Sequence, residues 1–380
     1  MATPVIDVFQ GRLAVTHVPD RQRWSTIAEA LDADVRQGFE WGELRRRAGW
    51  HPVRIAVLRG DEPMAACALL IRSAPGLGSV LYASRGPLIR EGSAEAAYPL
   101  LGEIRRIAAR QRAILLRASP DVRVEAQTSL APLARLGFRP IDDHFTAWNT
   151  PRVTQALDLR SSEEALWQAV RRRFREYVRA APRRGVVVDA EDDERALDGL
   201  YDLLVNVARL KNYPIRGLGY YRALFREYRA TGRVTLLVAR VGGVLAGGLL
   251  AIRLGRRSSM LYTSVRSEAG QTVKHHVAPA LYWEYIRRAR AEGCELADFG
   301  PSGVELEPRE TDSGYGVYRF KQGFGCVTVT YAPFHDLVFR PAIYRLFRLA
   351  ERGALPVLWR LRATGDQARA QLARALGARA

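Results

Sequence analysis

The feature that most constrains the fold of this chain is a succession of elements that occurs twice. An apolar hairpin comes first, followed by a short strand, a long helical pattern and a strand that ends near a proline. In the first half these stretches are residues 53–72, 79–84, 94–112 and 113–117. In the second half they are residues 234–253, 261–264, 273–292 and 294–299, about 180 positions later. The shared order, with Leu-Tyr-Ala-Ser in one copy and Leu-Tyr-Thr-Ser in the other, predicts an internal duplication.

A duplication within 380 residues predicts two α/β (α+β) domains of one architecture, because a chain of this length exceeds most single hydrophobic cores. The element order resembles the acetyltransferase fold known as GNAT. We therefore expect two tandem GNAT-like domains, at residues 1–150 and 151–332. Residues 333–380 are basic and amphipathic, which predicts C-terminal helices outside both domains.

The GNAT fold usually binds the pyrophosphate of acyl-CoA on backbone amides at the start of a helix. The residues involved follow a pattern of Arg or Gln, two residues, Gly, one residue, then Gly or Ala. The corresponding places here are residues 85–93 and 265–273, and neither contains that pattern. The sequence therefore disfavours an acyl-CoA donor.

The charge of the chain indicates a polyanionic partner. The formal net charge is +18, and nucleic acid, anionic lipid and a phosphorylated substrate all remain open. No apolar run approaches the ~18 residues of a membrane span, and the first residues lack the pattern of a secretion signal. Cys67, Cys294 and Cys326 lack metal-binding spacing, which indicates structural thiols in a reducing compartment. These features predict a cytoplasmic protein.

The most basic helical pattern lies between the two copies, at residues 166–184. Leu166, Val170 and Phe174 belong to an apolar stripe that can pack inward. Seven arginines with a single acid, Glu176, would repel one another without an anionic partner, so the segment predicts contact with phosphate or nucleic acid. The arginines are Arg171, Arg172, Arg173, Arg175, Arg179, Arg183 and Arg184.

Residues 297–325 place one lysine among aromatic residues and glycines. Lys321 follows Phe320 and precedes Gly323 and Phe324. A partly desolvated ammonium stabilises a developing oxyanion better than a solvated one, so Lys321 is a candidate catalytic residue. The alternative interpretation is a glycine-rich hairpin with an exposed lysine.

Several motifs together resemble the Fem family, whose members transfer amino acids from aminoacyl-tRNA onto peptidoglycan precursors. They are WGELRRRAGW at residue 41, YASRGP at 82, the basic segment ending RRG at 185, YPIRGLGYY at 213, and DFG followed by YRFKQGFG at 318. The resemblance spans about residues 35–335 and agrees with two GNAT-like domains. Many members carry a coiled-coil insertion in the second domain. This chain contains no heptad segment and resembles the compact form.

The resemblance implies roles for individual residues. Phe320 and Lys321 match a pair at the acceptor end of the tRNA, where the lysine is thought to stabilise the tetrahedral intermediate. The seven arginines of residues 171–184 would hold tRNA phosphates. Four residues match positions that bind the peptidoglycan precursor: Arg45, where the family has a phosphate-binding lysine, Arg216, Tyr220 and Tyr262.

Two positions depart from the family. Ser119 stands where the family has Asp in an Arg-x-Asp-Pro sequence, and a serine cannot act as a carboxylate base. Ile114 replaces a tyrosine that contacts the substrate. These changes leave open an acceptor outside the cell wall, such as a small peptide or a lipid amine.

The expected chemistry needs few groups, because the aminoacyl ester of tRNA is already activated. Attack by an amine requires chiefly alignment and oxyanion stabilisation. We therefore expect no metal and no cofactor, with aminoacyl-tRNA as the co-substrate. His275 and His276 do not have the i, i+4 spacing of a helical metal site and are interpreted as structural or surface residues.

The tail and the charge leave two further interpretations open. The basic helices after residue 340 could lie on an anionic membrane at the cytoplasmic leaflet, or could pack on the first domain. Besides the tRNA-dependent transferase, the chain could be a GNAT-type N-acyltransferase that uses acyl-CoA. It could also be a non-catalytic binder of nucleic acid or anionic membrane, which only its charge favours.

Overall fold

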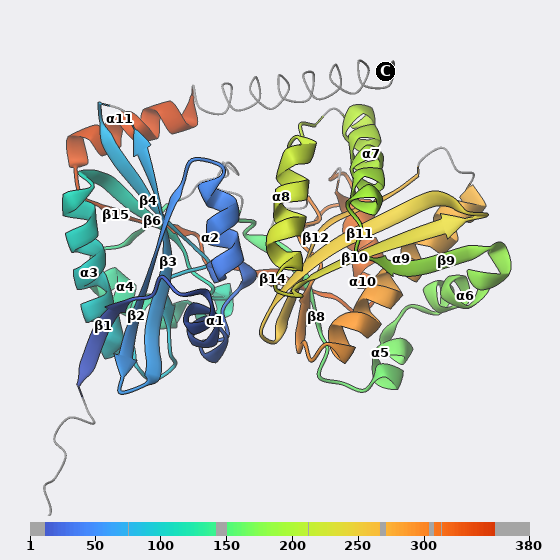
Figure 1. Cartoon of the computed structure of the whole chain (residues 1–380), viewed down its shortest axis with the longest axis horizontal. Helices are drawn as coiled ribbons and strands as arrows, with labels where there is room; N and C mark the ends of the chain where they lie inside the picture. Colours follow the sequence, from blue (N-terminus) through green and yellow to red (C-terminus); the bar gives the residue numbers. More distant parts are fainter. Residues whose placement is uncertain are drawn as a thin grey trace, which may run out of the picture. The chain divides into compact units, whose positions relative to one another are not determined.

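The structure is a computed structural model that describes residues 12–74, 76–141, 150–211, 213–266, 271–303, 308–312 and 314–353. The chain divides into two compact units (Figure 1). The first contains the residues up to Arg152 together with 331–350, and the second contains residues 153–330 and, at the end of the described chain, 351–353. The predicted pair of GNAT-like α/β domains is confirmed.

The first unit is built on one mixed sheet. Its described strands follow the order β1 (Leu13–His17), β2 (His51–Arg59), β3 (Glu62–Ala74), β4 (Gly78–Ser84), β6 (Ala113–Ser119), β15 (Phe334–Val338) and β7 (Arg139–Ile141), with β5 (Leu88–Ile89) paired to β3. Neighbouring strands are antiparallel except β4 and β6, which are parallel. The parallel pair is joined by a helical crossover, as the predicted strand, helix and strand require.

The helices of this unit are α1 (Arg21–Ala30), α2 (Phe39–Arg46), α3 (Ala97–Arg110), α4 (Ala131–Arg135) and α11 (Pro341–Arg352). α3 buries Leu100, Ile104 and Ile107 at helical spacing against β1, β2, β3 and β6. These side chains join Leu81 and Leu116 in the main core of the unit.

The second unit repeats the arrangement. Its sheet follows the order β14 (Val327–Thr330), β8 (Val153–Asp158), β13 (Leu296–Asp298), β12 (Arg257–Val265), β11 (Val244–Leu254), β10 (Val234–Val241) and β9 (Val186–Glu191). The run from β10 to β13 corresponds to the run from β2 through β3 and β4 to β6. β12 and β13 are again the parallel pair.

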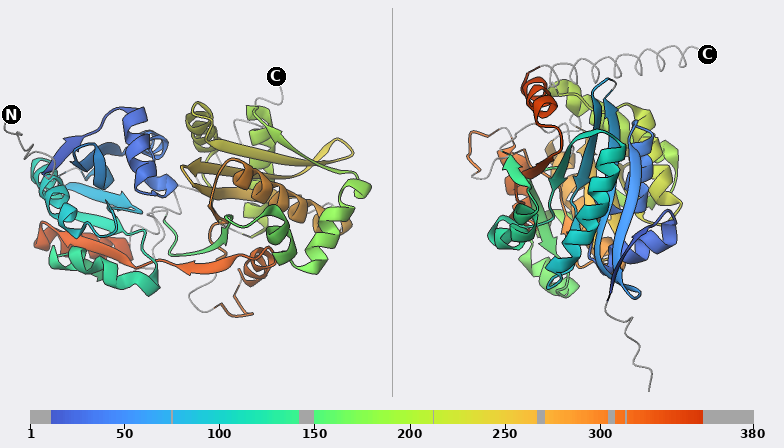
Figure 2. Two further views of the ribbon diagram at one scale, coloured as in Figure 1. Left: turned by 90° about the horizontal axis from the view of Figure 1, so that it is seen from below. Right: turned by 90° about the vertical axis from the view of Figure 1, so that its left-hand side faces the viewer.

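Helices cover both faces of the second sheet (Figures 1 and 2). They are α5 (Glu163–Ala169), α6 (Arg172–Ala180), α7 (Glu194–Leu210), α8 (Leu218–Arg229), α9 (Gln271–Ala291) and α10 (Tyr315–Gln322). Two consecutive glycines of β11 let α7 and α9 approach closely. A Cβ on Gly247 would lie 2.7 Å from Val277 of α9, and one on Gly248 would lie 3.1 Å from Leu200 of α7.

The chain returns to the first unit after β14, which corrects the expected domain boundaries. We expected only basic helices from residue 333, but residues 334–338 form β15 between β6 and β7. A buried ion pair holds β15 there. Arg117 of β6 donates from Nε and Nη2 to the two carboxylate oxygens of Asp336, each at 2.8 Å. Both side chains are almost fully buried, and Tyr344 of α11 also donates to Asp336.

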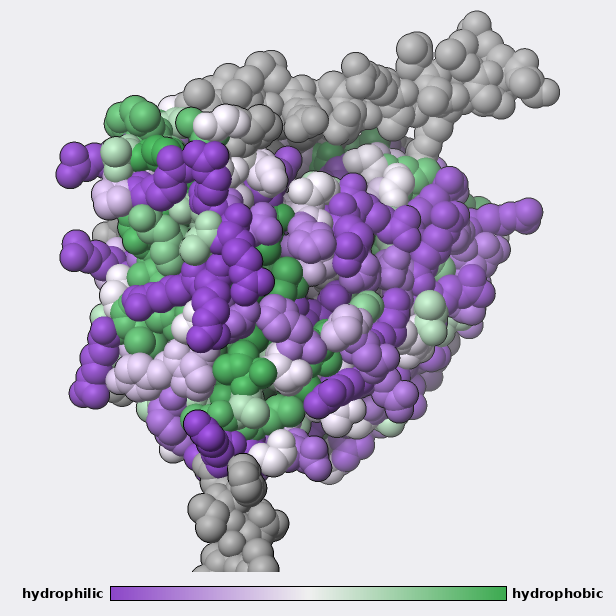
Figure 3. All heavy atoms as spheres, turned by 60° about the vertical axis from the view of Figure 1, so that its left-hand side comes forward, coloured by the Kyte–Doolittle hydropathy of each residue, from purple (hydrophilic) through white to green (hydrophobic). Residues whose placement is uncertain are grey.

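Hydrophilic side chains dominate the face in Figure 3, in keeping with the high charge of the chain. Among the helices that the structure describes, none is both long enough and apolar enough to cross a bilayer.

The ion pair gives a stability prediction. Replacing Asp336 with alanine leaves the Arg117 guanidinium buried without its bidentate carboxylate, so the free energy of unfolding should fall by about 3–5 kcal/mol. Asp158→Ala breaks an exposed pair with Arg160 and should cost at most about 1 kcal/mol. Urea unfolding of both variants measures the difference. Equal losses would show that β15 does not depend on this pair.

Candidate active site

Lys321 is buried at the end of α10, with 4% of its surface exposed. Its Nζ donates to the carbonyl oxygens of Gly300 at 3.0 Å and Pro301 at 2.8 Å. The third Nζ hydrogen has no acceptor within the described part of the chain. The alternative interpretation, a hairpin with an exposed lysine, is wrong, because residues 315–322 are helical and the ammonium points into the unit.

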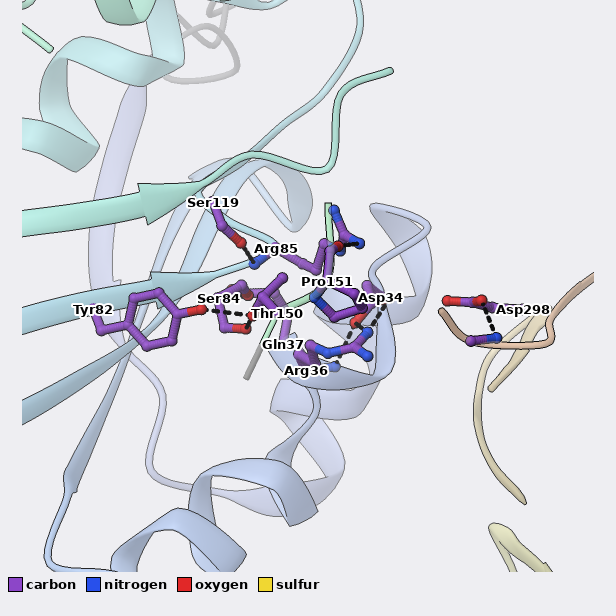
Figure 4. Close-up of polar contacts among 11 residues, drawn as sticks. Asp34, Arg36, Gln37, Tyr82, Ser84, Arg85, Ser119, Thr150, Pro151 and Asp298 are labelled. Carbon is purple, nitrogen blue, oxygen red and sulfur yellow. Dashed lines mark hydrogen bonds and ion pairs between the residues drawn. The ribbon is translucent and has the colours of Figure 1, made fainter. Parts of the chain in front are cut away.

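The turn that presents these two carbonyls is fixed by its own sequence. Asp298 ends β13 and accepts a 2.7 Å hydrogen bond from the Gly300 amide (Figure 4). Gly300 has a φ of +73°, and a Cβ there would lie 3.2 Å from the Met260 carbonyl oxygen. Both the backbone conformation and the close approach favour glycine at this position.

Burial dominates the electrostatics of Lys321. Desolvation lowers its pKa to about 8, and the nearby Asp298 carboxylate opposes the shift. Cys326 lies close enough to interact with the ammonium, but burial keeps the pKa of its thiol well above the ordinary value. At neutral pH Lys321 therefore holds its proton in a site that makes it more acidic than a solvated lysine.

The parallel strands of the second unit separate beside this turn. β12 and β13 pair only from Arg257 with Leu296 to Ser259 with Asp298, whereas β12 continues to Val265. In the first unit the corresponding pair, β4 and β6, stays paired through Ser84 and Ser119. A bulge in the β11–β12 ladder adds to the irregularity of β12 at this point. In the second unit, therefore, the part of β12 after Ser259 is not paired with β13, whereas the first unit has no such unpaired stretch between β4 and β6.

Three predicted substrate-binding residues lie together in the second unit. The Arg216 guanidinium lies 4.6 Å from the centre of the Tyr220 ring. Tyr221 links the group, with its ring centre 5.8 Å from that of Tyr220 and 4.6 Å from that of Tyr262. Burial and the neighbouring tyrosines Tyr220 and Tyr221 raise the pKa of Tyr262. Their predicted role in binding a precursor stays a prediction.

Phe320 connects α10, the helix that contains Lys321, to the basic segment of residues 166–184, called the arginine segment below. Its ring centre lies 5.0 Å from that of Phe174 in α6 and 4.9 Å from that of Tyr282 in α9. Phe324 packs on the same group, 5.2 Å from Phe174. α10, the helix that contains Lys321, is thus anchored through Phe320 in a cluster of aromatic rings.

The arginine segment forms two helices instead of the single one that its pattern suggested. α5 ends at Val170, which has an extended backbone, and α6 begins after Arg171. The Arg171 amide donates to the Gly323 carbonyl at 2.7 Å, which fastens the start of α6 to the end of α10.

The predicted inward stripe of this segment is confirmed, with Leu166 and Val170 buried and Phe174 partly buried. Most of its arginines face solvent, as predicted, and few are neutralised by acids. Arg172 pairs with Glu176 at 2.9 Å, and Arg175, which is half-buried, bonds Gln168 instead. The exposed members are Arg171, Arg172, Arg173, Arg179, Arg183 and Arg184.

The remaining predicted residues lie in the first unit. Arg45 is buried, 5% exposed, with its guanidinium 5.4 Å from the centre of the Trp50 ring. The Ser119 hydroxyl accepts a 3.0 Å hydrogen bond from the Arg85 amide (Figure 4). Ile114 is fully buried beneath α11. The two departures from the family pattern therefore serve the interior of the first unit.

The adjacent histidines take part in packing. The Tyr177 carbonyl lies 3.0 Å from Nδ1 of His276, and the His275 ring stacks on the Tyr177 ring. Within the described residues no three His, Cys, Asp or Glu side chains gather as a metal site.

Sequence reasoning missed Asp298, the two carbonyls and the contact between Phe174 and Phe320. An aspartate followed closely by Gly-Pro at the end of a strand is the signal that could have located the turn. The carbonyl contacts depend on how residues 300 and 321 meet in space, which no local pattern contains.

The fold places the chain among the GNAT-type transferases. Two tandem GNAT-like units, with a buried lysine beside the parallel strands of the second, agree with the match of residues 168–322 to the acetyltransferase (GNAT) domain. The FemAB family pattern matches residues 24–242, more than half of the chain. The chain therefore belongs to the FemAB family.

Known proteins extend this relationship. The lipid II:glycine glycyltransferase of Staphylococcus aureus is 21% identical over an alignment of 401 positions that covers 87% of this chain and 94% of the relative. The crystal structure of FemX superposes with a TM-score of 0.79 at 20% identity, covering 88% of this chain and 99% of FemX. A tandem GNAT protein from the clavulanic acid biosynthesis pathway has a TM-score of 0.51 at 16% identity, covering 86% of this chain and 98% of that protein.

The junction of α6 and α10 gives a second prediction. A Cβ at Gly323 would lie 2.3 Å from the Phe174 ring, so Gly323→Ala should lower the free energy of unfolding by about 1–3 kcal/mol. Gly316 in the same helix has open space at its Cβ, and Gly316→Ala should stabilise by about 0.5–1 kcal/mol. Thermal unfolding of the two variants tests this. If Gly323→Ala is as stable as Gly316→Ala, the close approach of Gly323 to the Phe174 ring is contradicted.

Proposed function

We propose that the protein transfers an amino acid from aminoacyl-tRNA to the side-chain amine of a peptidoglycan precursor's stem peptide. The observation that carries the proposal is the buried Lys321 ammonium. Two of its hydrogens are held by the Gly300 and Pro301 carbonyls, and the third, which has no acceptor among the residues that the structure describes, would bond a substrate oxygen. A preorganised donor in a desolvated site is what an acyl-transfer oxyanion requires.

The reaction can be written with this one donor. The acceptor amine attacks the ester carbonyl carbon, a C–N bond forms, and the carbonyl oxygen becomes an oxyanion that accepts a hydrogen bond from the third N–H of Lys321 Nζ, which keeps its proton. Collapse breaks the bond to the ribose oxygen, and the proton of the amine passes to that oxygen, with the neighbouring ribose hydroxyl as relay. The products are the amide and uncharged tRNA. The remaining barrier is reduced by alignment of the two substrates.

The arginine segment supports tRNA as the donor. Six exposed arginines carry few acid partners, and such a surface attracts a phosphate backbone. α6 packs directly on α10 through Phe174 and Phe320. A tRNA held by α6 would therefore lie next to the helix that contains Lys321.

The acceptor is supported by the relatives and by one group of side chains. The Staphylococcus aureus relative is named for lipid II, a peptidoglycan precursor, and it aligns over 94% of its length. Arg216, Tyr220 and Tyr262 lie together in the unit that contains Lys321, and aromatic and guanidinium groups suit a substrate with phosphates and a peptide.

A second candidate is an N-acyltransferase that uses acyl-CoA, which the match to the GNAT domain favours. The absent pyrophosphate pattern at residues 85–93 and 265–273 weighs against it. A transfer assay with both donors distinguishes the two candidates.

The assay combines a pool of labelled aminoacyl-tRNAs with nucleotide-linked or lipid-linked pentapeptide precursors. We expect label to move to a precursor, and Lys321→Met to lower kcat by about 10²–10³ with little change in KM, because the donor acts in the transition state. Arg319→Met, an exposed change in the same helix, is the control and should keep full activity. Equal activity of Lys321→Met, or transfer only from acetyl-CoA, would refute the proposal.

The pKa of Lys321 predicts a pH dependence. Lys321 must be charged, so the rate of single turnovers at saturating acceptor should fall as the pH rises through about 8. Asp298 and Cys326 are the groups that act on the ammonium: the Asp298 carboxylate raises the pKa of Lys321, and burial keeps the pKa of the Cys326 thiol well above its ordinary value. Asp298→Asn removes the carboxylate that raises the pKa of Lys321, while its amide oxygen can still accept from Gly300. The falling limb should therefore move to lower pH. An unchanged limb would exclude Lys321 as the titrating group.

A further inference from the structure

The outer side of α11 exposes apolar residues. The helix packs inward through Ile343, Tyr344 and Phe347 against the first sheet. On the opposite side Leu346 is 64% exposed and Leu349 is 67% exposed. Residues three apart are neighbours on a helix surface, so the two leucines form one apolar strip.

The exposed charged residues of α11 are all basic. Arg345 and Arg352 are exposed on the same side of α11. Glu351, the one acid in the helix sequence, is buried, with 1% of its surface exposed. The outward face thus combines two leucines with arginines and carries no carboxylate of α11.

The hairpin between β3 and β4 extends this surface beyond the start of the helix. Leu77 at its tip is 51% exposed, and Arg340 donates to the Leu77 carbonyl at 2.6 Å. Figure 3 shows apolar side chains, in green, next to strongly hydrophilic ones in the region of α11. We call Leu77, Arg345, Leu346, Leu349 and Arg352 the α11 face.

We propose that the α11 face docks on the surface of an anionic membrane. A helix with leucines flanked by arginines suits the boundary between head groups and acyl chains, because the leucines enter the apolar layer while the guanidinium groups contact lipid phosphates. The inference goes beyond the proposed transfer reaction and does not require it, although a lipid-linked precursor would be met at such a surface.

Charge favours a membrane over two other occupants. A second copy of the chain would bring the same arginines against one another. Residues 354–380 contain five arginines and one aspartate, so that segment would also add like charge to the face. An anionic lipid surface is complementary to the arginines of the α11 face and to those of residues 354–380.

Sedimentation with vesicles tests the proposal on the full chain. Vesicles of equal parts phosphatidylglycerol and phosphatidylcholine should bind the wild type, increasingly weakly as salt rises, and pure phosphatidylcholine vesicles should bind it poorly. The double variant Leu346→Ser, Leu349→Ser should bind the anionic vesicles at least about tenfold more weakly. Leu210→Ser, which changes a leucine that is 71% exposed in the second unit, is the matched control and should bind like the wild type.

Two results would overturn the proposal. The first is equal binding of the double variant and the wild type to anionic vesicles, or no binding of either. The second is a wild-type dimer in light scattering that the double variant abolishes, which would assign the face to a second copy. Transfer to a soluble, nucleotide-linked precursor should be unchanged in the double variant, so failure of the membrane proposal is distinguishable from failure of the transfer reaction.

Discussion

The site depends on a buried ammonium whose position is set by two backbone carbonyls. Removing a charge from water is expensive, and such a group persists only where hydrogen bonds compensate it. Gly300 and Pro301 supply them, since Asp298 and the positive φ of Gly300 turn both carbonyls toward Lys321. The same burial lowers the pKa of Lys321 to about 8, which makes its N–H groups stronger hydrogen-bond donors than those of a solvated lysine. Packing of the Phe320 ring against Phe174 and Tyr282 anchors the helix that contains Lys321.

The two copies of the fold use the equivalent place differently. In the first unit β4 and β6 remain paired to their ends, and Tyr82 is buried with its hydroxyl hydrogen-bonded to Thr150 (Figure 4). In the second unit the matching Tyr262 is half-buried within a group of tyrosines next to Arg216. One copy closes the position with internal hydrogen bonds, and the other leaves part of β12 free. Three of the four residues predicted to bind the precursor, Arg216, Tyr220 and Tyr262, lie in the second unit.

The sequence was sufficient for the repeated architecture because each copy has strong local patterns, such as the hairpin around residues 240–243 and the periodic apolar face of residues 94–112. It also singled out Lys321, Phe320 and the arginine segment, whose predicted roles stay predictions. It could not show that residues 334–338 return to the first sheet, because strand pairing over more than 200 residues leaves no local trace. It also missed the contact between Phe174 and Phe320, and the burial of Arg45. Both features are set by tertiary packing, whereas the local sequence around each residue is basic and predicts exposure to solvent.

Binding of two stable analogues to wild type and Lys321→Met tests the central claim most directly. One is an amide-linked aminoacyl-tRNA, which resembles the ground state, and the other is a phosphonate that joins the donor end to the acceptor amine and mimics the tetrahedral oxyanion. If Lys321 stabilises the oxyanion, Lys321→Met should weaken binding of the phosphonate by about 10²–10³ and leave binding of the amide nearly unchanged. Equal effects on the two analogues would contradict it, because Lys321 would then hold the donor rather than stabilise the oxyanion.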